Sequence, residues 1–303
     1  MSRNNWPLQT KFLHALFGMG KRLAPADIDR LLAPSPRWIQ VTRPTVGIPR
    51  LPGGWDGATI AILSDLHIGR FIRLPYVRRV MEIVRSLGPD LVALVGDYLI
   101  RNGELAGEIL DCFRSLRAPL GVFAVLGNHD HWHRPKQVRA ALESAGIVVL
   151  VNSHRMISRG GAALCLAGVD DAWESRADVA AALAGAPEEA PHLLLCHNPD
   201  FAELLPPAPR VDLMLSGHTH GGQVRLPFLT NLLVPIRHKK YLQGLVRGPR
   251  CPVYVCRGAG AIGIPLRFRC PPEITLLTLR SQPAAGPGTF PTTPPRPEPE
   301  RPT

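Results

Sequence analysis

The chain has 303 residues, 45% of them hydrophobic, and a formal net charge of +11. This suits one large globular domain with length to spare for tails, and no stretch reaches the roughly 18 apolar residues of a membrane-spanning helix. The positive charge favours anionic partners, such as nucleic acid, phosphorylated metabolites or acidic lipid headgroups, without choosing among them.

The six cysteines do not indicate a disulfide framework or a zinc finger. None belongs to a C-x-x-C pair, and Cys165 and Cys196 lie in apolar runs typical of buried strands. Scattered cysteines of this kind fit a reducing compartment better than a secreted protein. We therefore expect a cytoplasmic protein, with peripheral contact to the inner membrane as an open alternative.

Residues 1–37 are expected to form an N-terminal extension ahead of the main domain. Between Lys11 and Leu23, apolar residues fall at helical spacing and basic residues flank them, although Gly18 and Gly20 weaken a helix there. Such an amphipathic segment either packs on the core or lies in the surface of an anionic membrane. Both interpretations stay open.

The main domain is expected over residues 38–280, with an irregular lead-in at 38–58. Apolar runs predict strands at 59–64, 91–95, 122–126, 147–151, 164–169, 193–196, 213–215, 253–256 and 274–279. Helical periodicity predicts helices at 75–87, 105–116 and 135–145. This alternation indicates an α/β fold with sheets buried on both faces. The later strands follow one another without long helices, which predicts mixed or antiparallel pairing in part of the fold.

Residues 281–303 contain eight prolines and almost no large apolar side chains. A segment of this composition cannot bury enough surface to offset the entropy lost on ordering. We expect a disordered, proline-rich tail.

Polar side chains cluster immediately after five of the predicted strands. They are Asp65, His67, Asp97, Asn128, His129, Asp130, His197, His218 and His220. Binding sites of open α/β sheets form at the carboxyl ends of strands, so these residues are expected to build one cluster. A single histidine after a strand is usually structural, but five such strand ends together favour a functional site.

The residue types in this cluster favour divalent metal ions. Carboxylates, imidazoles and one carboxamide indicate a site for Mn, Fe, Zn or similar divalent ions rather than a cysteine-rich structural zinc site. If seven of these nine side chains are ligands, they are too many for one tetrahedral ion. Two ions that share one carboxylate would use all seven. A pair of such ions can clamp a phosphoryl group and activate a water molecule. Gly96, Gly127 and Gly217 each precede a candidate ligand and would permit tight turns close to the ions.

These motifs resemble the calcineurin-like metallophosphoesterase superfamily in order and roughly in spacing. The longer matching strings are SDLHIG at 64–69, GNHDHW at 127–132, HNPD at 197–200, GHTHGGQVRLP at 217–227, RGAGAIGIPLRF at 257–268 and PPEITLLTL at 271–279. They are similar to the YkuE/YaeI-like phosphodiesterase branch and span about residues 38–280. The resemblance implies a two-sheet β-sandwich flanked by helices, with a dinuclear metal site at the strand carboxyl ends.

The resemblance also implies a role for each residue of the cluster. It implies a first ion held by Asp65, His67, Asp97 and His220. It implies a second ion held by Asp97, Asn128, His197 and His218, with Asp97 bridging the two. A metal-activated hydroxide would attack phosphorus, His129 would act as general acid, and Asp130 would orient His129.

Several alternatives about function remain open at this stage. The leading hypothesis is a divalent-metal-dependent phosphodiesterase or pyrophosphatase, with a lipid-linked substrate such as UDP-2,3-diacylglucosamine in lipid A synthesis implied by resemblance alone. A nuclease or cyclic-nucleotide phosphodiesterase ranks lower, because the sequence shows no interleaved aromatic and basic residues for stacking on nucleic acid. A non-catalytic docking module is the rival from another class, and no protein partner is inferred. Arg70 and Arg257 would either grip a substrate phosphate or form ordinary salt bridges.

Overall fold

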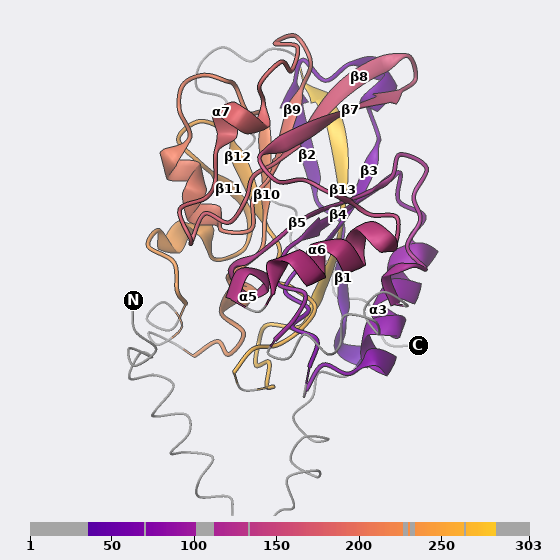
Figure 1. Cartoon of the computed structure of the whole chain (residues 1–303), viewed down its shortest axis with the longest axis vertical. Helices are drawn as coiled ribbons and strands as arrows, with labels where there is room; N and C mark the ends of the chain where they lie inside the picture. The colour runs from indigo at the N-terminus through magenta and orange to yellow at the C-terminus, as the bar shows by residue number, and fades with distance from the viewer. Residues whose placement is uncertain are drawn as a thin grey trace, which may run out of the picture.

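Two β-sheets pack face to face in a computed structural model of the chain (Figure 1). The structure describes residues 36–282 apart from 70, 101–111, 133, 227–229, 231–233 and 264. The predicted N-terminal segment at 11–23, nearly all of the proline-rich tail, most of the helix at 105–116, and Arg70 therefore lie outside the described residues.

The first sheet has seven strands and follows the order β1-β13-β3-β4-β5-β6, with β2 also paired to β13. The strands are β1 (Gln40–Thr42), β2 (Thr45–Pro49), β3 (Thr59–Leu63), β4 (Leu91–Val95), β5 (Val122–Val125), β6 (Val148–Val149) and β13 (Glu273–Gln282). Strands β3, β4, β5 and β6 pair in parallel, and β13 runs antiparallel to β3. The carboxyl ends of β3, β4 and β5 therefore lie at one edge of the sheet.

The second sheet has six strands in the order β11-β12-β10-β9-β8-β7. The strands are β7 (Ser153–Arg159), β8 (Ala162–Gly168), β9 (His192–Leu195), β10 (Leu213–Ser216), β11 (Gly244–Arg247) and β12 (Pro252–Val255). The four central strands pair in parallel, whereas the edge strands β7 and β11 pair antiparallel to their neighbours. The prediction of mixed pairing late in the chain is confirmed.

Alternating side chains of the central strands serve two different cores, because successive residues of a strand point to opposite faces. In β3, Ile60 and Ile62 belong to the core between the sheets, while Ala61 and Leu63 face the outer core with the helices. The apolar runs of the sequence record this two-sided burial.

Helices cover the outer faces of both sheets. The α-helices are α3 (Leu74–Ser86), α5 (Asn128–Trp132), α6 (Pro135–Ser144) and α7 (Val179–Ala182). The 3-10 helices are η1 (Pro36–Trp38), η2 (Gly53–Trp55), η4 (Pro199–Leu204), η5 (His220–Gly222) and η6 (Lys239–Leu242). Helices α3 and α6 pack on the outer face of the first sheet (Figure 1), where α3 buries Val77, Val80 and Val84 along one stripe.

Residues 38–58 are not the irregular lead-in that the sequence predicts, because they contain β1 and β2. Both strands are short and half exposed, and they pair with β13 from the far end of the chain. Such a distant partner leaves no mark on the local pattern.

Among the described residues, no helix is long and apolar enough to cross a membrane.

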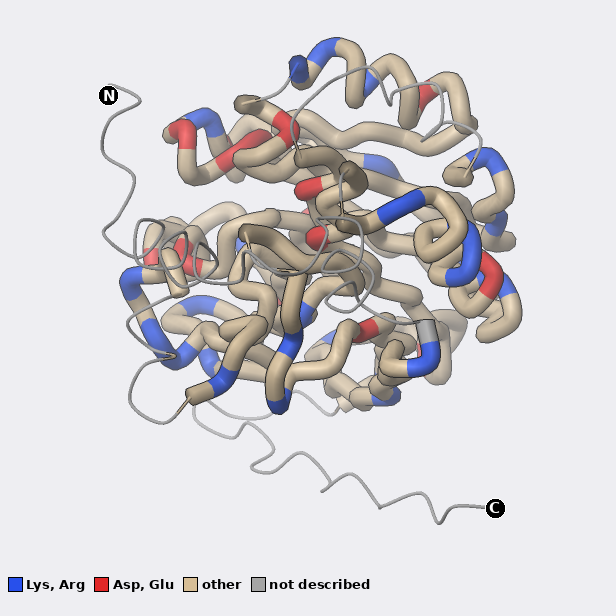
Figure 2. The backbone as a smooth tube through the Cα atoms, turned by 90° about the horizontal axis from the view of Figure 1, so that it is seen from below, with Lys and Arg blue, Asp and Glu red and all other residues tan. Residues whose placement is uncertain are grey.

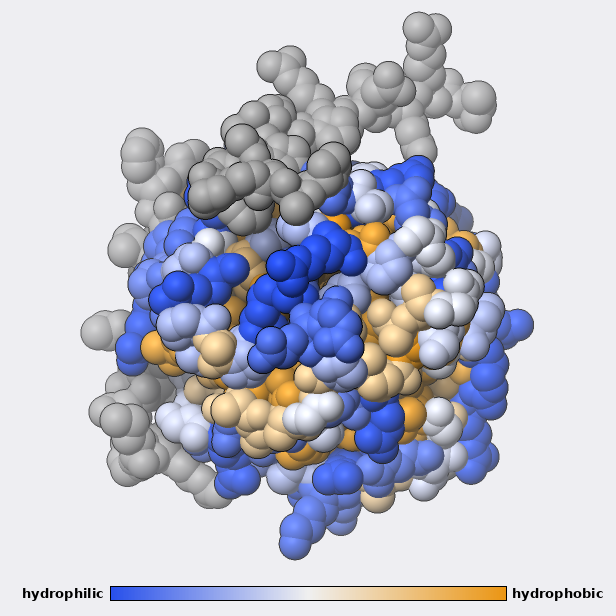
Figure 3. Space-filling view, turned by 90° about the horizontal axis from the view of Figure 1, so that it is seen from above, coloured by the Kyte–Doolittle hydropathy of each residue, from blue (hydrophilic) through white to orange (hydrophobic). Residues whose placement is uncertain are grey.

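The surface is mixed at the end of the molecule that carries the β7–β8 hairpin. Figure 3 shows this end, with hydrophilic side chains interspersed with smaller apolar areas. In the described part of the chain, Lys and Arg are scattered around the outline of the body when it is viewed from below (Figure 2). The positive charge there is spread rather than gathered on one face.

Candidate metal centre

The polar residues after five strands meet at the seam between the two sheets, as the sequence predicts. Within the described residues, three groups of side chains each bring their ligand atoms within 4.8 Å of one another. The groups are Asp65, His67 and His220; His67, Asp97 and His129; and Asp97, His197 and His218. The first group contains residues that follow β3 and β10, more than 150 positions apart in the chain.

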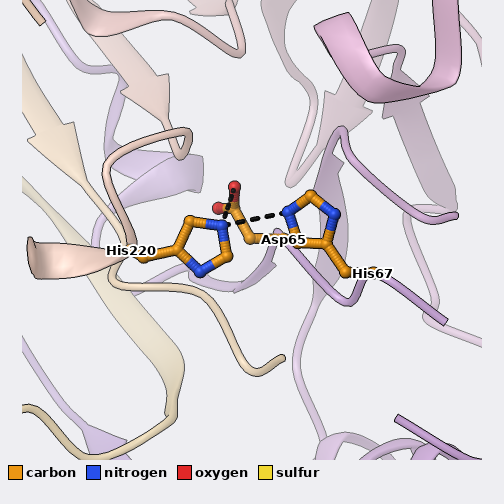
Figure 4. A group of neighbouring side chains, drawn as sticks. All are labelled: Asp65, His67 and His220. Atoms are coloured by element: carbon orange, nitrogen blue, oxygen red, sulfur yellow. Dashed lines mark hydrogen bonds and ion pairs between the residues drawn. The ribbon is translucent and has the colours of Figure 1, made fainter. Parts of the chain in front are cut away.

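The first group closes around two facing imidazoles and one carboxylate. Nε2 of His67 lies 3.0 Å from Nε2 of His220, and Asp65 Oδ1 lies 3.4 Å from the same His220 nitrogen. Figure 4 shows the three side chains pointing toward one another, Asp65 and His67 from the loop after β3 and His220 from the segment after β10. All three are buried.

Asp97 joins the first group to the third, which contains His197 and His218. Its Oδ2 lies 3.5 Å from Nε2 of His67 and 3.2 Å from Nε2 of His197. That His197 nitrogen is in turn 3.3 Å from Nδ1 of His218. A carboxylate in this position can reach two neighbouring ions at once.

Hydrogen bonds between the sheets hold these side chains in place. Nδ1 of His197 donates to the Val95 carbonyl at 2.7 Å, which leaves Nε2 directed at Asp97. The backbone N–H of His218 donates to the Asp65 carboxylate at 3.1 Å, and the Ser64 hydroxyl donates to it as well. Outer hydrogen bonds of this kind fix the tautomer and orientation of metal ligands.

The backbone of the site is strained at five of the candidate ligands. Their φ angles are positive, in the left-handed region that residues other than glycine seldom adopt: Asp65, His67, Asp97, His218 and His220. Each such residue costs about 1–3 kcal/mol unless its surroundings hold it, and such strain clusters at functional sites.

The glycines that precede the ligands allow close packing, as the sequence predicts. A Cβ atom on Gly127 would collide with the Asp97 carboxylate, and one on Gly217 would lie 2.6 Å from Asp65 Oδ2 and from Ser64 Oγ. Gly96 has a φ of +86°. Alanine at these positions would displace the ligands themselves.

His129 lies beside the first group, and the next residue, Asp130, is buried among the backbones of the neighbouring loops. The His129 ring meets the His67 ring edge-on at 4.8 Å, and its backbone N–H donates to Asp97 Oδ1 at 2.9 Å. The buried Asp130 carboxylate accepts from the backbone N–H groups of Asp97 at 2.8 Å, Tyr98 at 2.9 Å and Gly127 at 2.9 Å. Asp130 thus holds the loops after β4 and β5 together through their backbones.

Burial and neighbouring charge set the ionisation of the cluster. Burial lowers the pKa of His67 and of His218 to about 3, so both are neutral imidazoles. Burial also acts to lower the pKa of His197, but the charge and hydrogen bond of Asp97, together with the charge of Asp65 and the bond to Val95, outweigh it and raise that pKa to about 10. Burial acts to raise the pKa of Asp97, yet His197 and the other histidines hold it well below its ordinary value. Asp97 and His197 therefore form an ion pair in the metal-free protein.

An unsatisfied oxygen in the cluster fits a metal ion. Among the described residues, the buried Asn128 Oδ1 has no hydrogen-bond partner, and buried unsatisfied groups are rare. Two nitrogen ligands of one ion lie about 3 Å apart, because each metal–nitrogen distance is about 2 Å. The facing nitrogens of His67 and His220 have this spacing. The residues present thus suit divalent ions in number, type and arrangement.

Sequence reasoning missed Arg267, a buried cation that joins the segment of His220 to a glycine-containing loop beside Asp65. Its guanidinium donates to the carbonyls of Gly260 at 2.7 Å, Gly258 at 3.0 Å and His220 at 3.3 Å. Gly260 N–H in turn donates to the Asp65 carbonyl at 2.9 Å. An arginine within an apolar run was the available signal, but its carbonyl partners are distant in sequence.

Arg257 forms a salt bridge within the described structure. Its Nε lies 2.7 Å from Glu273 Oε2, and both side chains are mostly buried. Of the two interpretations that the sequence left open, the structure favours the ordinary salt bridge.

The model of the calcineurin-like phosphoesterase family matches residues 58–222, a span that contains every residue of the cluster. This chain belongs to that family. An uncharacterised metallophosphoesterase of Bacillus subtilis, YkuE, is 34% identical over 279 residues, which cover 89% of this chain and 97% of that protein. Phosphodiesterase YaeI of Escherichia coli is 34% identical over 227 residues, which cover 73% of this chain and 81% of that protein.

A third relative is a zebrafish transmembrane protein with a metallophosphoesterase domain, 33% identical over 82% of this chain and 58% of that protein. The recognition of the superfamily and of its YkuE/YaeI-like branch is confirmed. The chain is a metal-dependent phosphoester hydrolase of α/β fold that uses two divalent ions.

Proposed function

We propose that this enzyme cleaves phosphodiester or pyrophosphate bonds at a two-metal centre. The observation that carries the proposal is the position of Asp97, which lies within 3.5 Å of an imidazole of each ligand group. The relative of this chain in Escherichia coli, YaeI, is named a phosphodiesterase, which supports the proposed diester specificity.

Seven side chains are proposed to hold the ions. The first ion takes Asp65, His67, Asp97 and His220, and the second takes Asp97, Asn128, His197 and His218. The bound ions supply Lewis acidity and an activated water for attack on phosphorus. The chain's own residues orient these ligands, and the buried Asp65 and Asp97 carboxylates provide the negative charge that neutralises the cations.

His129 is proposed to donate a proton to the departing oxygen. It is half-buried at the edge of the first group, where its ring meets the His67 ring edge-on. Asp130 is proposed as a positioning residue, because its carboxylate fixes the backbone on either side of His129 and Asp97. Such proton transfer typically contributes about 10²–10⁴-fold to a rate.

A metal analysis paired with a substrate panel tests the proposed function. The panel compares a phosphomonoester, bis-(p-nitrophenyl) phosphate, a cyclic nucleotide, single-stranded DNA and UDP-2,3-diacylglucosamine. We expect two ions per chain and turnover of diesters or pyrophosphates above the monoester. Turnover of the monoester alone would refute the diester specificity. Preferential turnover of UDP-2,3-diacylglucosamine would identify the lipid-linked substrate, and of DNA the nuclease alternative.

The ligand assignment is tested by substituting one proposed ligand of each ion. His220→Ala should release the first ion and His218→Ala the second, so each variant should retain one ion. His238→Ala, an exposed histidine, serves as the control and should retain both. Loss of the same ion from both His218 and His220 variants would contradict the assignment.

A further inference from the structure

Two exposed tryptophans stand at the edge of the metal centre. The Trp132 side chain is 48% exposed and the Trp173 side chain 45%, although indole rings are usually well buried. The Trp132 ring contacts the His129 ring at a centroid distance of 4.6 Å, and the Trp173 ring lies 5.4 Å from the ring of His218. Each indole therefore adjoins an imidazole of the site while much of it faces solvent.

The two tryptophans lie in segments that follow strands of different sheets, and a hydrogen bond links these segments. Trp132 ends α5, which follows β5, and Trp173 lies in the loop after β8. Trp132 Nε1 donates to Glu174 Oε1 at 2.8 Å, so the indole of one segment is anchored to the residue next to the other indole.

A second contact fixes the same loop to α5. His131 Nε2 lies 2.8 Å from Asp170 Oδ1, and both side chains are largely buried. Within the loop, Asp171 Oδ2 accepts from the N–H of Glu174 at 2.9 Å. Asn152, which precedes β7, accepts through Oδ1 from the N–H of Asp170 at 2.9 Å. The loop that carries Trp173 is thereby held against α5 at two points.

We propose that Trp132 and Trp173 form an aromatic subsite that binds a planar ring, aryl or nucleobase, on a substituent of the phosphate. The inference rests on the proposed function, because it takes the phosphate to be held at the metal centre. Indole rings bind such planar groups by stacking, which is worth about 1–3 kcal/mol per base. Local sequence patterns do not indicate this pair, because its members are far apart along the chain.

The position of the pair favours a ring on the substrate over a lipid surface. Both indoles touch imidazoles of the site, so a group bound to them lies within reach of a phosphate at the ions. Trp132 also donates to the carboxylate of Glu174, the residue next to Trp173, and an anionic bilayer would repel this carboxylate. Acyl-chain binding is thus an alternative that the experiment must separate.

Three phosphonates that share one metal-binding group test the subsite. Calorimetry on the metal-loaded full chain would measure dissociation constants for methyl-, cyclohexyl- and phenylphosphonate. We expect the wild type to bind phenylphosphonate at least about fivefold more tightly than cyclohexylphosphonate, in line with the energy of stacking. Trp132→Ala and Trp173→Ala should abolish this preference and leave the affinity for methylphosphonate and the metal content unchanged.

Two further variants serve as controls. Trp38→Ala removes another exposed indole, in η1, and should retain the preference for phenylphosphonate. Glu174→Ala frees Trp132 Nε1 and should weaken phenylphosphonate alone, to a smaller extent.

Several results would overturn the subsite. Equal binding of cyclohexyl- and phenylphosphonate, lost together in the tryptophan variants, would indicate an apolar site for acyl chains. Unchanged phenylphosphonate binding in both tryptophan variants would remove the pair from recognition. Reduced methylphosphonate affinity or metal content in those variants would show that they support the centre instead. Failure of the proposed function would differ, because the wild type itself would bind neither ions nor methylphosphonate, and both proposals would fall.

Discussion

The two sheets contribute different chemistry to the same site. The oxygen donors Asp65, Asp97 and Asn128 follow β3, β4 and β5 of the first sheet. The loops after β9 and β10 of the second sheet supply imidazoles alone: His197, His218 and His220. The first sheet thus brings the negative charge that attracts cations, and the second brings most of the neutral nitrogen donors.

This division makes the centre a property of the seam. The His218 N–H bonds to Asp65 and the His197 ring bonds to the Val95 carbonyl, and each of these contacts joins one sheet to the other. Neither sheet alone holds a complete ligand set. Substitutions on the two sides of the seam can therefore separate the contribution of each sheet to metal binding, catalysis and stability.

The largest effect is expected when the shared carboxylate of the first sheet is removed. Asp97→Ala should eliminate both ions, since this residue adjoins imidazoles of both groups. Loss of several kcal/mol of metal-based stabilisation corresponds to at least about a thousandfold fall in kcat/KM. Metal analysis and kinetics with bis-(p-nitrophenyl) phosphate would measure it. Wild-type hydrolysis by this variant would refute the two-metal mechanism.

A large but selective effect is expected at His129. His129→Gln should keep both ions and lower kcat by about 10²–10⁴-fold for a diester with an alkoxide leaving group. With p-nitrophenolate, which departs without a proton, the loss should be below about tenfold. Equal losses for both leaving groups would contradict the assignment of His129 as proton donor.

An intermediate effect is expected at Arg267, which joins the segment of His220 to the loop after β12 that contacts Asp65. Arg267→Met leaves the carbonyls of Gly258, Gly260 and His220 without their buried donor. Loss of such outer support should weaken the first ion by about 10–100-fold, with less effect on the second. Metal titration would separate the two ions, and Arg267→Lys should recover part of the affinity. Equal weakening of both ions would indicate general destabilisation instead.

The smallest effect is expected at the ion pair of His131 and Asp170. Burial acts to lower the pKa of His131, but the Asp170 carboxylate outweighs it and raises that pKa above 6.5. The contribution of His131 to stability is therefore complete below 6.5 and is lost as the pH rises through the raised pKa. Burial acts to raise the pKa of Asp170, but His131 holds it below 3.8, so its contribution is lost only in stronger acid.

Denaturant titration of His131→Gln against the wild type would test this pH window. The variant should be less stable by about 1 kcal/mol or less between pH 4 and 6.5. The difference should shrink as the pH rises above 6.5. A difference that grows with pH would show that neutral His131 is the stabilising form.

The location of the site and the residues that gather there could be predicted from local sequence patterns. Buried parallel strands are recorded as apolar runs, so the polar residues that end each run, such as Asp65, Asp97 and His197, stand out locally. The position of a strand end in a parallel sheet then follows from general rules of topology. The order and spacing of these residues also sufficed to recognise the family.

How those residues meet, and what surrounds them, depends on the packing of the whole fold. The left-handed backbone of Asp65 and His220, the carbonyl partners of Arg267, and the pairing of Trp132 with the loop of Trp173 each depend on segments far apart in the chain. The short strands β1 and β2 were missed for the same reason, because their partner β13 is distant in sequence. Local patterns record which face of a strand is buried, but contacts between loops arise only when both sheets have packed.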